Sequence, residues 1–200
     1  MWALTNNTPR KENSMIGYAF CGSFCTLSLA LSGMEALARS GYEIQPIMSE
    51  RTYETSTRFF AAEELHRRVR EITGKAIIHT VKDAEPLGPK TPLHALIIAP
   101  CTGNTLAKLA SGITDTAVTM AAKAHLRQDR PLLIALASND AMSQNLGNIG
   151  TLISRKSVYF VPLRQDDPVS KPHSLVADFA RLGEAYDAMM MKRQLRPLFC

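Results

Sequence analysis

Hydroxyl, amide and small side chains follow a long apolar run in the middle of the chain. The run covers residues 93–99, and the polar segment is Pro100-Cys101-Thr102-Gly103-Asn104-Thr105. A near-continuous apolar run is typical of a strand buried on both faces of its sheet. A turn that ends such a strand and opens a helix presents free backbone N–H groups, which bind anions such as phosphate. We interpret this turn as the centre of a ligand site.

Three other turns of similar composition follow predicted strands, so all four are expected at one edge of a sheet. Small polar residues also make good loops, and for a single turn that explanation would be sufficient. The occurrence of four such turns favours ligand binding. No turn has the GxGxxG spacing of a dinucleotide site or the GxxxxGK[ST] spacing of an NTPase, so a monophosphate fits better than a triphosphate. The candidate cofactor-binding residues are Gly22, Ser23, Phe24, Cys25, Ser49, Pro100, Cys101, Thr102, Gly103, Asn104, Thr105, Ser138, Asn139, Asp140, Ala141 and Met142.

The elements that position these turns alternate between apolar strands and amphipathic helices. This alternation predicts an α/β fold, a three-layer doubly wound parallel sheet of the Rossmann-like kind. We expect strands at residues 15–20, 42–48, 76–79, 93–99, 132–137 and 157–161, and helices at residues 27–38, 59–72, 114–127, 146–153 and 175–191. Residues 83–92 hold three prolines and are expected to be a loop. Residues 1–14 are expected to be a loose extension, and residues 15–200 one domain with a C-terminal helix from about residue 174.

The composition is that of an ordinary globular protein. The chain has 200 residues, of which 46% are hydrophobic and 20% charged, and its formal net charge is +5. This basic excess suits small anionic ligands, and no nucleic-acid motif accompanies it, so we expect neither nucleic acid nor membrane as a partner. The four cysteines form no CxxC pair or zinc-type cluster. They therefore predict free thiols in a reducing, cytoplasmic compartment and no metal site.

One segment imitates a signal peptide. Arg10 and Lys11 precede the apolar residues 15–31. Gly22 and Ser23 interrupt this run, however, and a strand, a turn and a helix explain the same residues without export.

The central turn resembles a motif of a known family. The segment at residues 100–105 is similar to the Pro-Ala-Ser-Ala-Asn-Thr motif of the homo-oligomeric flavin-containing cysteine decarboxylase superfamily. Residues 108–115 are similar to that family's Lys-Ile-Ala-x-Gly-Ile-x-Asp, and Asp140-Ala141-Met142-Ser143 to its Pro-Ala-Met-Asn with both ends altered. The resemblance covers most of residues 15–161. It implies bound FMN with its phosphate at Gly22-Ser23, and a trimer-based homo-oligomer in which neighbouring subunits complete the flavin site.

Further segments resemble one branch of that superfamily. They are Glu85-Pro86-Leu87-Gly88-Pro89-Lys90, Ala121-Ala122-Lys123-Ala124, Ser138-Asn139-Asp140-Ala141 and Gln165-Asp166-Asp167-Pro168. The resemblance implies a flavoprotein subunit in the mother-cell cytoplasm of a spore-forming bacterium. It further implies a dehydrogenase-like partner subunit, NADP through that partner, and a small dicarboxylate substrate. The implied reaction oxidises a dihydro-type intermediate of the lysine pathway to pyridine-2,6-dicarboxylate.

A catalytic residue of the superfamily is missing. Its decarboxylases carry a histidine before the central strand, and the corresponding position here falls near Pro86. His94 lies inside the apolar run and does not fit that place. The resemblance therefore points to redox chemistry by a flavin. The candidate catalytic residues are Asn104, which either holds the cofactor or orients a substrate carboxylate, and Cys25, which is either a redox thiol or a small packing residue.

Two other functions stay open at this point, a non-catalytic subunit that stabilises its partner and a flavin-dependent decarboxylase. Individual residues also allow two interpretations. Asp115 either caps its helix or contacts the cofactor. Gln165, Asp166 and Lys171 either close over a dicarboxylate or belong to an ordinary proline-containing turn.

Overall fold

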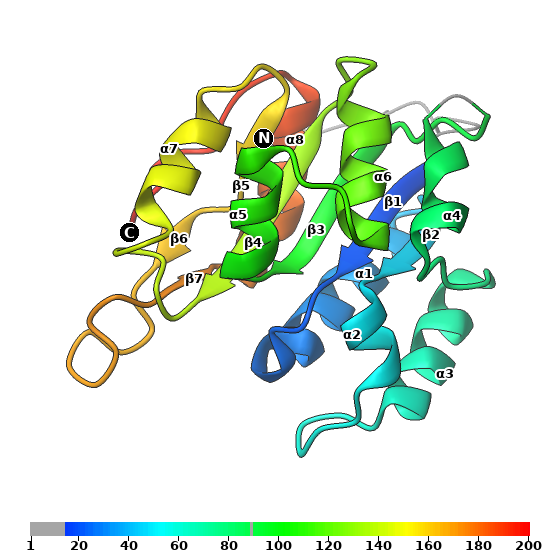
Figure 1. Ribbon diagram of the computed structural model, residues 1–200, viewed down its shortest axis with the longest axis horizontal. Coiled ribbons are helices and arrows are strands. Elements are labelled where there is room, and N and C mark those ends of the chain that lie inside the picture. Colours follow the sequence, from blue (N-terminus) through cyan, green and yellow to red (C-terminus); the bar gives the residue numbers. More distant parts are fainter. Residues whose placement is uncertain (1–14, 89) are drawn as a thin grey trace, which may run out of the picture.

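A mostly parallel β-sheet forms the centre of the structure, a computed structural model that describes residues 15–88 and 90–200 (Figure 1). The strand order is β2-β1-β3-β4-β7-β6, and β5 also pairs with β4. The parallel strands are β1 (Met15–Phe20), β2 (Glu43–Met48), β3 (Ala95–Cys101), β4 (Leu132–Ser138) and β5 (Val158–Phe160). The antiparallel strands are β6 (Leu163–Arg164) and β7 (Leu175–Ala177). The predicted fold class is confirmed, whereas the extension expected at residues 1–14 lies outside the described residues.

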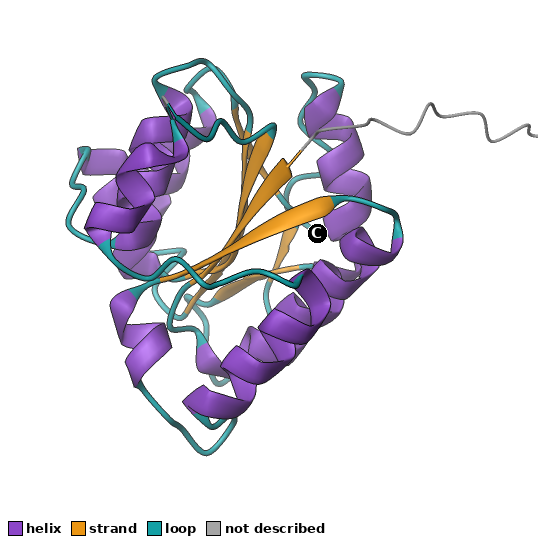
Figure 2. Ribbon diagram, turned by 90° about the vertical axis from the view of Figure 1, so that its right-hand side faces the viewer, coloured by secondary structure: helices purple, strands orange, loops and turns teal. Residues whose placement is uncertain are grey.

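Helices cover both faces of the sheet (Figure 2). On one face α1 (Leu27–Arg39) packs against α3 (Ala62–Thr73) and α8 (Leu182–Met190). The helices of the other face are α4 (Val81–Ala84), α6 (Ala117–Leu126), α5 (Gly103–Ser111) and α7 (Leu146–Ile153), and each packs against the next. The short helices are η1 (Phe24–Thr26), α2 (Glu50–Glu54), η2 (Glu85–Leu87) and η3 (Phe179–Arg181). None of the described helices is long and apolar enough to cross a membrane.

The secondary structure predicted from the sequence was wrong at three places. The strand predicted at residues 76–79 is reduced to a single parallel bridge between Ile47 and Ile78. The loop predicted at residues 83–92 begins with the end of α4 and with η2, where Pro86 occupies an early helical position that proline tolerates. The C-terminal helix begins only at Leu182, because residues 175–177 form β7 and pair with the end of β4.

Parallel pairing brings the carboxyl ends of β1, β2, β3 and β4 to one edge of the sheet. Phe20 pairs with Met48, and Ile98 pairs with Ile134, so the strands end close to the same level. All seven residues of β3 are buried, because this strand has a neighbour on each side and helices over each face. Polar side chains can therefore reach solvent at this edge in the turns that follow the strands.

His125 is a buried polar residue at the opposite, amino edge. Its side chain is fully buried on α6, and Nε2 donates to the Pro131 carbonyl at 2.8 Å, just before β4. Nδ1 has no partner. Burial lowers the pKa of His125 to about 4, more than the hydrogen bond to Pro131 raises it. The folded protein therefore keeps this imidazole neutral.

This histidine predicts how stability depends on pH. Between about pH 4 and 6.5 the unfolded chain binds a proton at His125 that the folded protein does not bind, so stability falls as the pH falls through this window. The effect is at most about 3 kcal/mol in the free energy of unfolding. His125→Gln keeps a donor for Pro131 and should flatten this part of the profile in urea titrations at several pH values. His173→Gln, at an exposed position, is the control; equal slopes in both variants would contradict the assignment.

Candidate functional site

Hydrogen bonds join the first three turns at the carboxyl edge. The Cys21 amide donates to the Pro100 carbonyl at 3.1 Å, and the Ser49 amide donates to the Phe20 carbonyl at 3.0 Å. The Thr105 hydroxyl donates to the buried Cys21 thiol at 3.3 Å. Burial raises the pKa of Cys21 to about 11, and this outweighs the lowering effect of that hydrogen bond. The Cys21 thiol therefore stays protonated at neutral pH and links β1 to α5.

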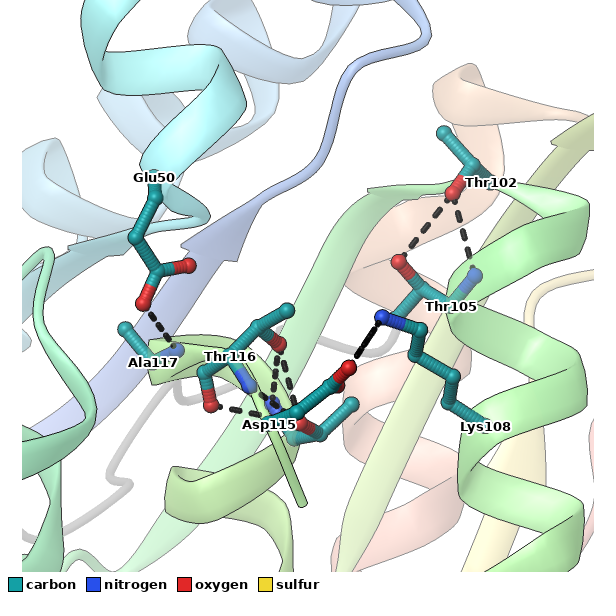
Figure 3. Close-up of polar contacts among 8 residues, drawn as sticks. Glu50, Thr102, Thr105, Lys108, Asp115, Thr116 and Ala117 are labelled. Carbon is teal, nitrogen blue, oxygen red and sulfur yellow. Dashed lines mark hydrogen bonds and ion pairs between the residues drawn. The ribbon is translucent and has the colours of Figure 1, made fainter. Parts of the chain in front are cut away.

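Thr102 begins α5 and uses its hydroxyl within its own turn (Figure 3). The hydroxyl accepts from the Thr105 amide at 3.2 Å and donates to the Thr105 hydroxyl at 3.1 Å. The next polar residue, Asn104, is exposed and has no hydrogen-bond partner for its side chain within the described chain. Pro100 and Cys101 are buried in β3. Asn104 is therefore the side chain of this turn that is free to meet a ligand.

Gly103 allows the fourth turn to pack against the third. A Cβ atom at Gly103 would lie 2.6 Å from Asn145 Nδ2 and 2.8 Å from Asp140 Oδ1, and it would also overlap the Ser138 hydroxyl. Ser138 and Asn145 both donate hydrogen bonds to the Asp140 carboxylate. These bonds lower the pKa of Asp140 and keep it ionised. The fourth turn thus places a negative charge beside the amino end of α5.

The first turn differs from the others in how its helix begins. The hydroxyls of Ser49 and Thr102 cap α2 and α5. Neither Ser23 nor Thr26 caps η1 or α1 with its side chain, and no acidic residue lies in the first turn of either helix. The Ser23 hydroxyl instead accepts from the Thr26 hydroxyl at 3.2 Å. The amino end of α1 therefore keeps its partial positive charge for an anionic ligand.

Exposure separates the remaining predicted residues at this edge. Those that are exposed or half-buried are Gly22, Phe24, Cys25, Asn139 and Met142. Ala141, in contrast, is fully buried under the fourth turn, so its side chain belongs to the core. The structure thus gathers the predicted turns at one edge, but only part of their side chains face outward.

The start of α6 is held by an acidic residue from α2 (Figure 3). Glu50 Oε1 accepts from the Ala117 amide at 3.1 Å, although the two residues are 67 positions apart. Thr116 is the cap of α6, and Asp115 instead pairs with Lys108 at 2.8 Å, which lowers the pKa of Asp115. Capping, one of the two roles expected for Asp115, is therefore wrong. No local sequence pattern indicates the contact of Glu50.

The loop between β6 and β7 reaches the same edge. The Met142 amide donates to the His173 carbonyl at 2.9 Å and ties this loop to the fourth turn. Lys171 pairs with Asp166 at 3.1 Å, and this hydrogen bond is the main cause that raises the pKa of Lys171. Cys25 of the first turn lies close enough to Lys171 to add to that effect. The loop thus places a cation within electrostatic range of the first turn.

His94 lies at the opposite edge. Its amide donates to the Met15 carbonyl at 2.8 Å, at the start of β1. His94 precedes β3, so the prediction that it lies inside the strand is wrong. The residues of η2, where the superfamily's decarboxylases are expected to carry their histidine, are Glu85, Pro86 and Leu87.

Comparisons of the sequence and the structure with known proteins identify the family of this chain. A family model described as Flavoprotein matches residues 4–181. The chain belongs to the flavoprotein family. It is 39% identical over 187 residues to the B subunit of dipicolinate synthase from Bacillus subtilis (strain 168), covering 94% of each chain. The crystal structure of the dipicolinate synthase B subunit from Bacillus halodurans C matches with 37% identity and a TM-score of 0.86, over 94% of this chain and 96% of that one.

These matches confirm both resemblances noted in the sequence, and the chain is a homologue of the dipicolinate synthase B subunit. A more distant match has the same fold. It is the crystal structure of the FMN-dependent cysteine decarboxylase SpaF, with 22% identity and a TM-score of 0.65 over 90% of this chain and 97% of that one.

The close approach at Gly103 predicts opposite effects for two glycine-to-alanine changes. Gly103→Ala should lower the free energy of unfolding by about 1–3 kcal/mol, because the new methyl group displaces the Ser138, Asp140 and Asn145 side chains. Gly147→Ala, in α7 with no atom within 4 Å of the new methyl, should raise it by about 0.5–1 kcal/mol. Urea unfolding measures both. A stabilising Gly103→Ala would show that the third and fourth turns do not pack as described.

Proposed function

We propose that this chain is the FMN-binding flavoprotein component of a dipicolinate synthase. The observation that carries the proposal is the amino end of α1, which lies at the carboxyl edge of the sheet without a side-chain cap or an acidic residue. Such an end is suited to a phosphate group. The other turns are less suitable, because Ser49 and Thr102 already cap their helices and Asp140 is negatively charged. We therefore place the FMN phosphate at residues 22–25.

The exposed groups of the other turns fit the remainder of a flavin. The amides of Asn104 and Asn139 offer both donors and acceptors, and the Met142 thioether offers apolar surface. Thr102, Ser49 and Thr105 contribute indirectly by holding their turns. The amide and thioether groups of these turns are neutral, and the charged group beside them is the hydrogen-bond-accepting carboxylate of Asp140, which suits a neutral ring system better than a second phosphate.

Bound FMN would supply two-electron oxidation. Aromatisation of a dihydrodipicolinate-type ring to pyridine-2,6-dicarboxylate removes two electrons and two protons. The residues of this chain would bind and orient the dianionic substrate, with the Lys171 ammonium and the Asn104 amide donating to its carboxylates. Lys171 would exchange Asp166 for the substrate, and the exposed Cys25 thiol lies within electrostatic range of this ammonium group.

The proposal includes two kinds of partner. The dehydrogenase-like A subunit of dipicolinate synthase would act with this chain in the cytoplasm of the mother cell and bring NADP. A second copy of this chain, in a trimer-based homo-oligomer, would cover the apolar groove of about 300 Å³ beside the fourth turn. Met142, Leu146 and Phe199 line this groove and are 42%, 48% and 52% exposed, so covering them would remove apolar surface from water.

Phosphate recognition by α1 predicts a selective effect of Ser23→Asp. An aspartate there is a good helix cap and should leave the fold stable, but its charge would repel the FMN phosphate. We expect the Kd for FMN to rise about tenfold or more, while the Kd for riboflavin, which lacks the phosphate, stays within about threefold. Flavin fluorescence quenching measures both. Ser32→Asp, at an exposed position later in α1, is the control; an unchanged FMN affinity in Ser23→Asp would contradict the proposed phosphate position.

The substrate contacts predict how two further variants behave with the dehydrogenase-like partner. Asn104→Ala should abolish dipicolinate formation yet leave the complex with that partner intact. Lys171→Gln should raise KM for the dicarboxylate about tenfold with a smaller change in kcat, because one charge-assisted hydrogen bond is lost. Full activity of Asn104→Ala would instead favour a non-catalytic subunit that only stabilises its partner. Lys82→Gln, exposed on α4, controls for the loss of a positive charge.

A further inference from the structure

A cavity of about 490 Å³ lies at the amino edge of the sheet, opposite the four turns. Its walls are the carboxyl end of α5, one side of α6 and the turn that leads from α7 into β5. These three helices lie on the same face of the sheet (Figure 1). The proposed flavin site uses none of the residues around this cavity.

Four cationic side chains line the cavity, and none of its lining residues is acidic. Lys123 lies on α6, and Arg127 follows one turn later as the residue that ends this helix. Within the described part of the chain neither forms an ion pair or a hydrogen bond through its side chain. Arg155 and Lys156 lie across the cavity. Arg155 donates a long hydrogen bond of 3.5 Å to the Leu109 carbonyl. Lys156 pairs at 3.4 Å with Asp129, and both of these side chains are largely exposed.

The positive charge of these four side chains exceeds the negative charge of the groups around them at this edge. Helices α5, α6 and α7 all end here, and the carboxyl end of a helix carries about −0.5 of an elementary charge. Three such ends and the Asp129 carboxylate amount to about −2.5, against about +4 from the four cationic side chains. A surplus of about +1.5 therefore remains around the cavity, available to an anion from solution.

Apolar side chains lie between the two cationic walls. Leu109 and Val158 are buried, Leu126 is half-buried and Ile113 is 47% exposed. A bare phosphate or sulfate would leave this apolar surface in contact with water. An aromatic ring would cover it, and negative groups at two sides of the ring would reach both walls.

We propose that this cavity binds an aromatic dicarboxylate, with one carboxylate at Lys123 and Arg127, the other at Arg155 and Lys156, and the ring over the apolar side chains. The site is separate from the proposed flavin site and does not depend on it.

Calorimetry with the full chain tests the proposal, with benzene-1,3-dicarboxylate as the probe. Benzoate, with one charge, and glutarate, with two charges but no ring, should each bind about tenfold more weakly than the probe. Lys123→Gln combined with Arg127→Gln should weaken binding of the probe about tenfold or more. The control combines Lys82→Gln with Arg196→Gln, two exposed cations elsewhere, and should bind as the unmodified chain does.

Three results would overturn the proposal. The first is no binding of the probe by the unmodified chain. The second is binding of the probe by the Lys123/Arg127 double variant that is as strong as binding by the unmodified chain. The third is an equal loss of binding in this variant and in the control double variant, which would show a general charge effect. Light scattering on each variant tests whether the face is instead a contact between copies, since a changed mass without binding of the probe would assign it to assembly. Should the α6 double variant fail to fold, Arg155→Gln on the opposite wall must give the same selective loss.

Discussion

Burial of β3 on both faces is the constraint on which the rest of the site depends. The strand has hydrogen-bonded neighbours on each side and no exposed residue, so its direction and register are fixed by β1 and β4. The chain can leave the core only at Thr102, and there it must begin a helix whose first N–H groups need acceptors. Thr102 supplies one acceptor, and the orientation of α5 then places Gly103 against the fourth turn. The site geometry follows from this single buried strand.

The hydroxyl groups at this edge serve mainly to hold the turns in place. Ser49 and Thr102 cap their helices, and Thr105 bonds to the Cys21 thiol. Loss of such a cap costs about 1 kcal/mol whether or not a ligand is bound. In the proposed flavin site, recognition would therefore fall to the backbone at the start of α1 and to the exposed amides of Asn104 and Asn139, whose side chains form no hydrogen bond with the described residues. The hydroxyl-rich motif therefore lies at the edge where the four turns meet, and the hydroxyls of Ser49, Thr102 and Thr105 form hydrogen bonds within and between these turns.

Those parts of the fold and site whose signals are local could be predicted from the sequence. The run at residues 93–99 and the polar turn after it gave the central strand, its helix and the edge at which they meet. Elements that depend on distant pairing could not be predicted. The three residues of β7 form a strand because they pair with β6 and with the end of β4, which lies about forty positions earlier. Glu50 reaches Ala117 across 67 positions, and the cations of the amino-edge cavity come from two segments about thirty residues apart.

The charges at the proposed flavin site favour one orientation of a bound molecule over the reverse one. The helix that starts at the first turn offers partial positive charge, whereas the fourth turn offers an ionised Asp140, held by Ser138 and Asn145. Under the proposed function, a molecule with one anionic end and one neutral end would bind this edge favourably in one orientation, with its phosphate at the first turn. The reverse orientation would bring the phosphate beside Asp140, and repulsion at short range would cost about 1–4 kcal/mol. The fold alone would not create this difference, since other doubly wound sheets also begin several helices at one edge. It arises because the sequence leaves α1 without a cap and places a hydrogen-bonded aspartate beside α5.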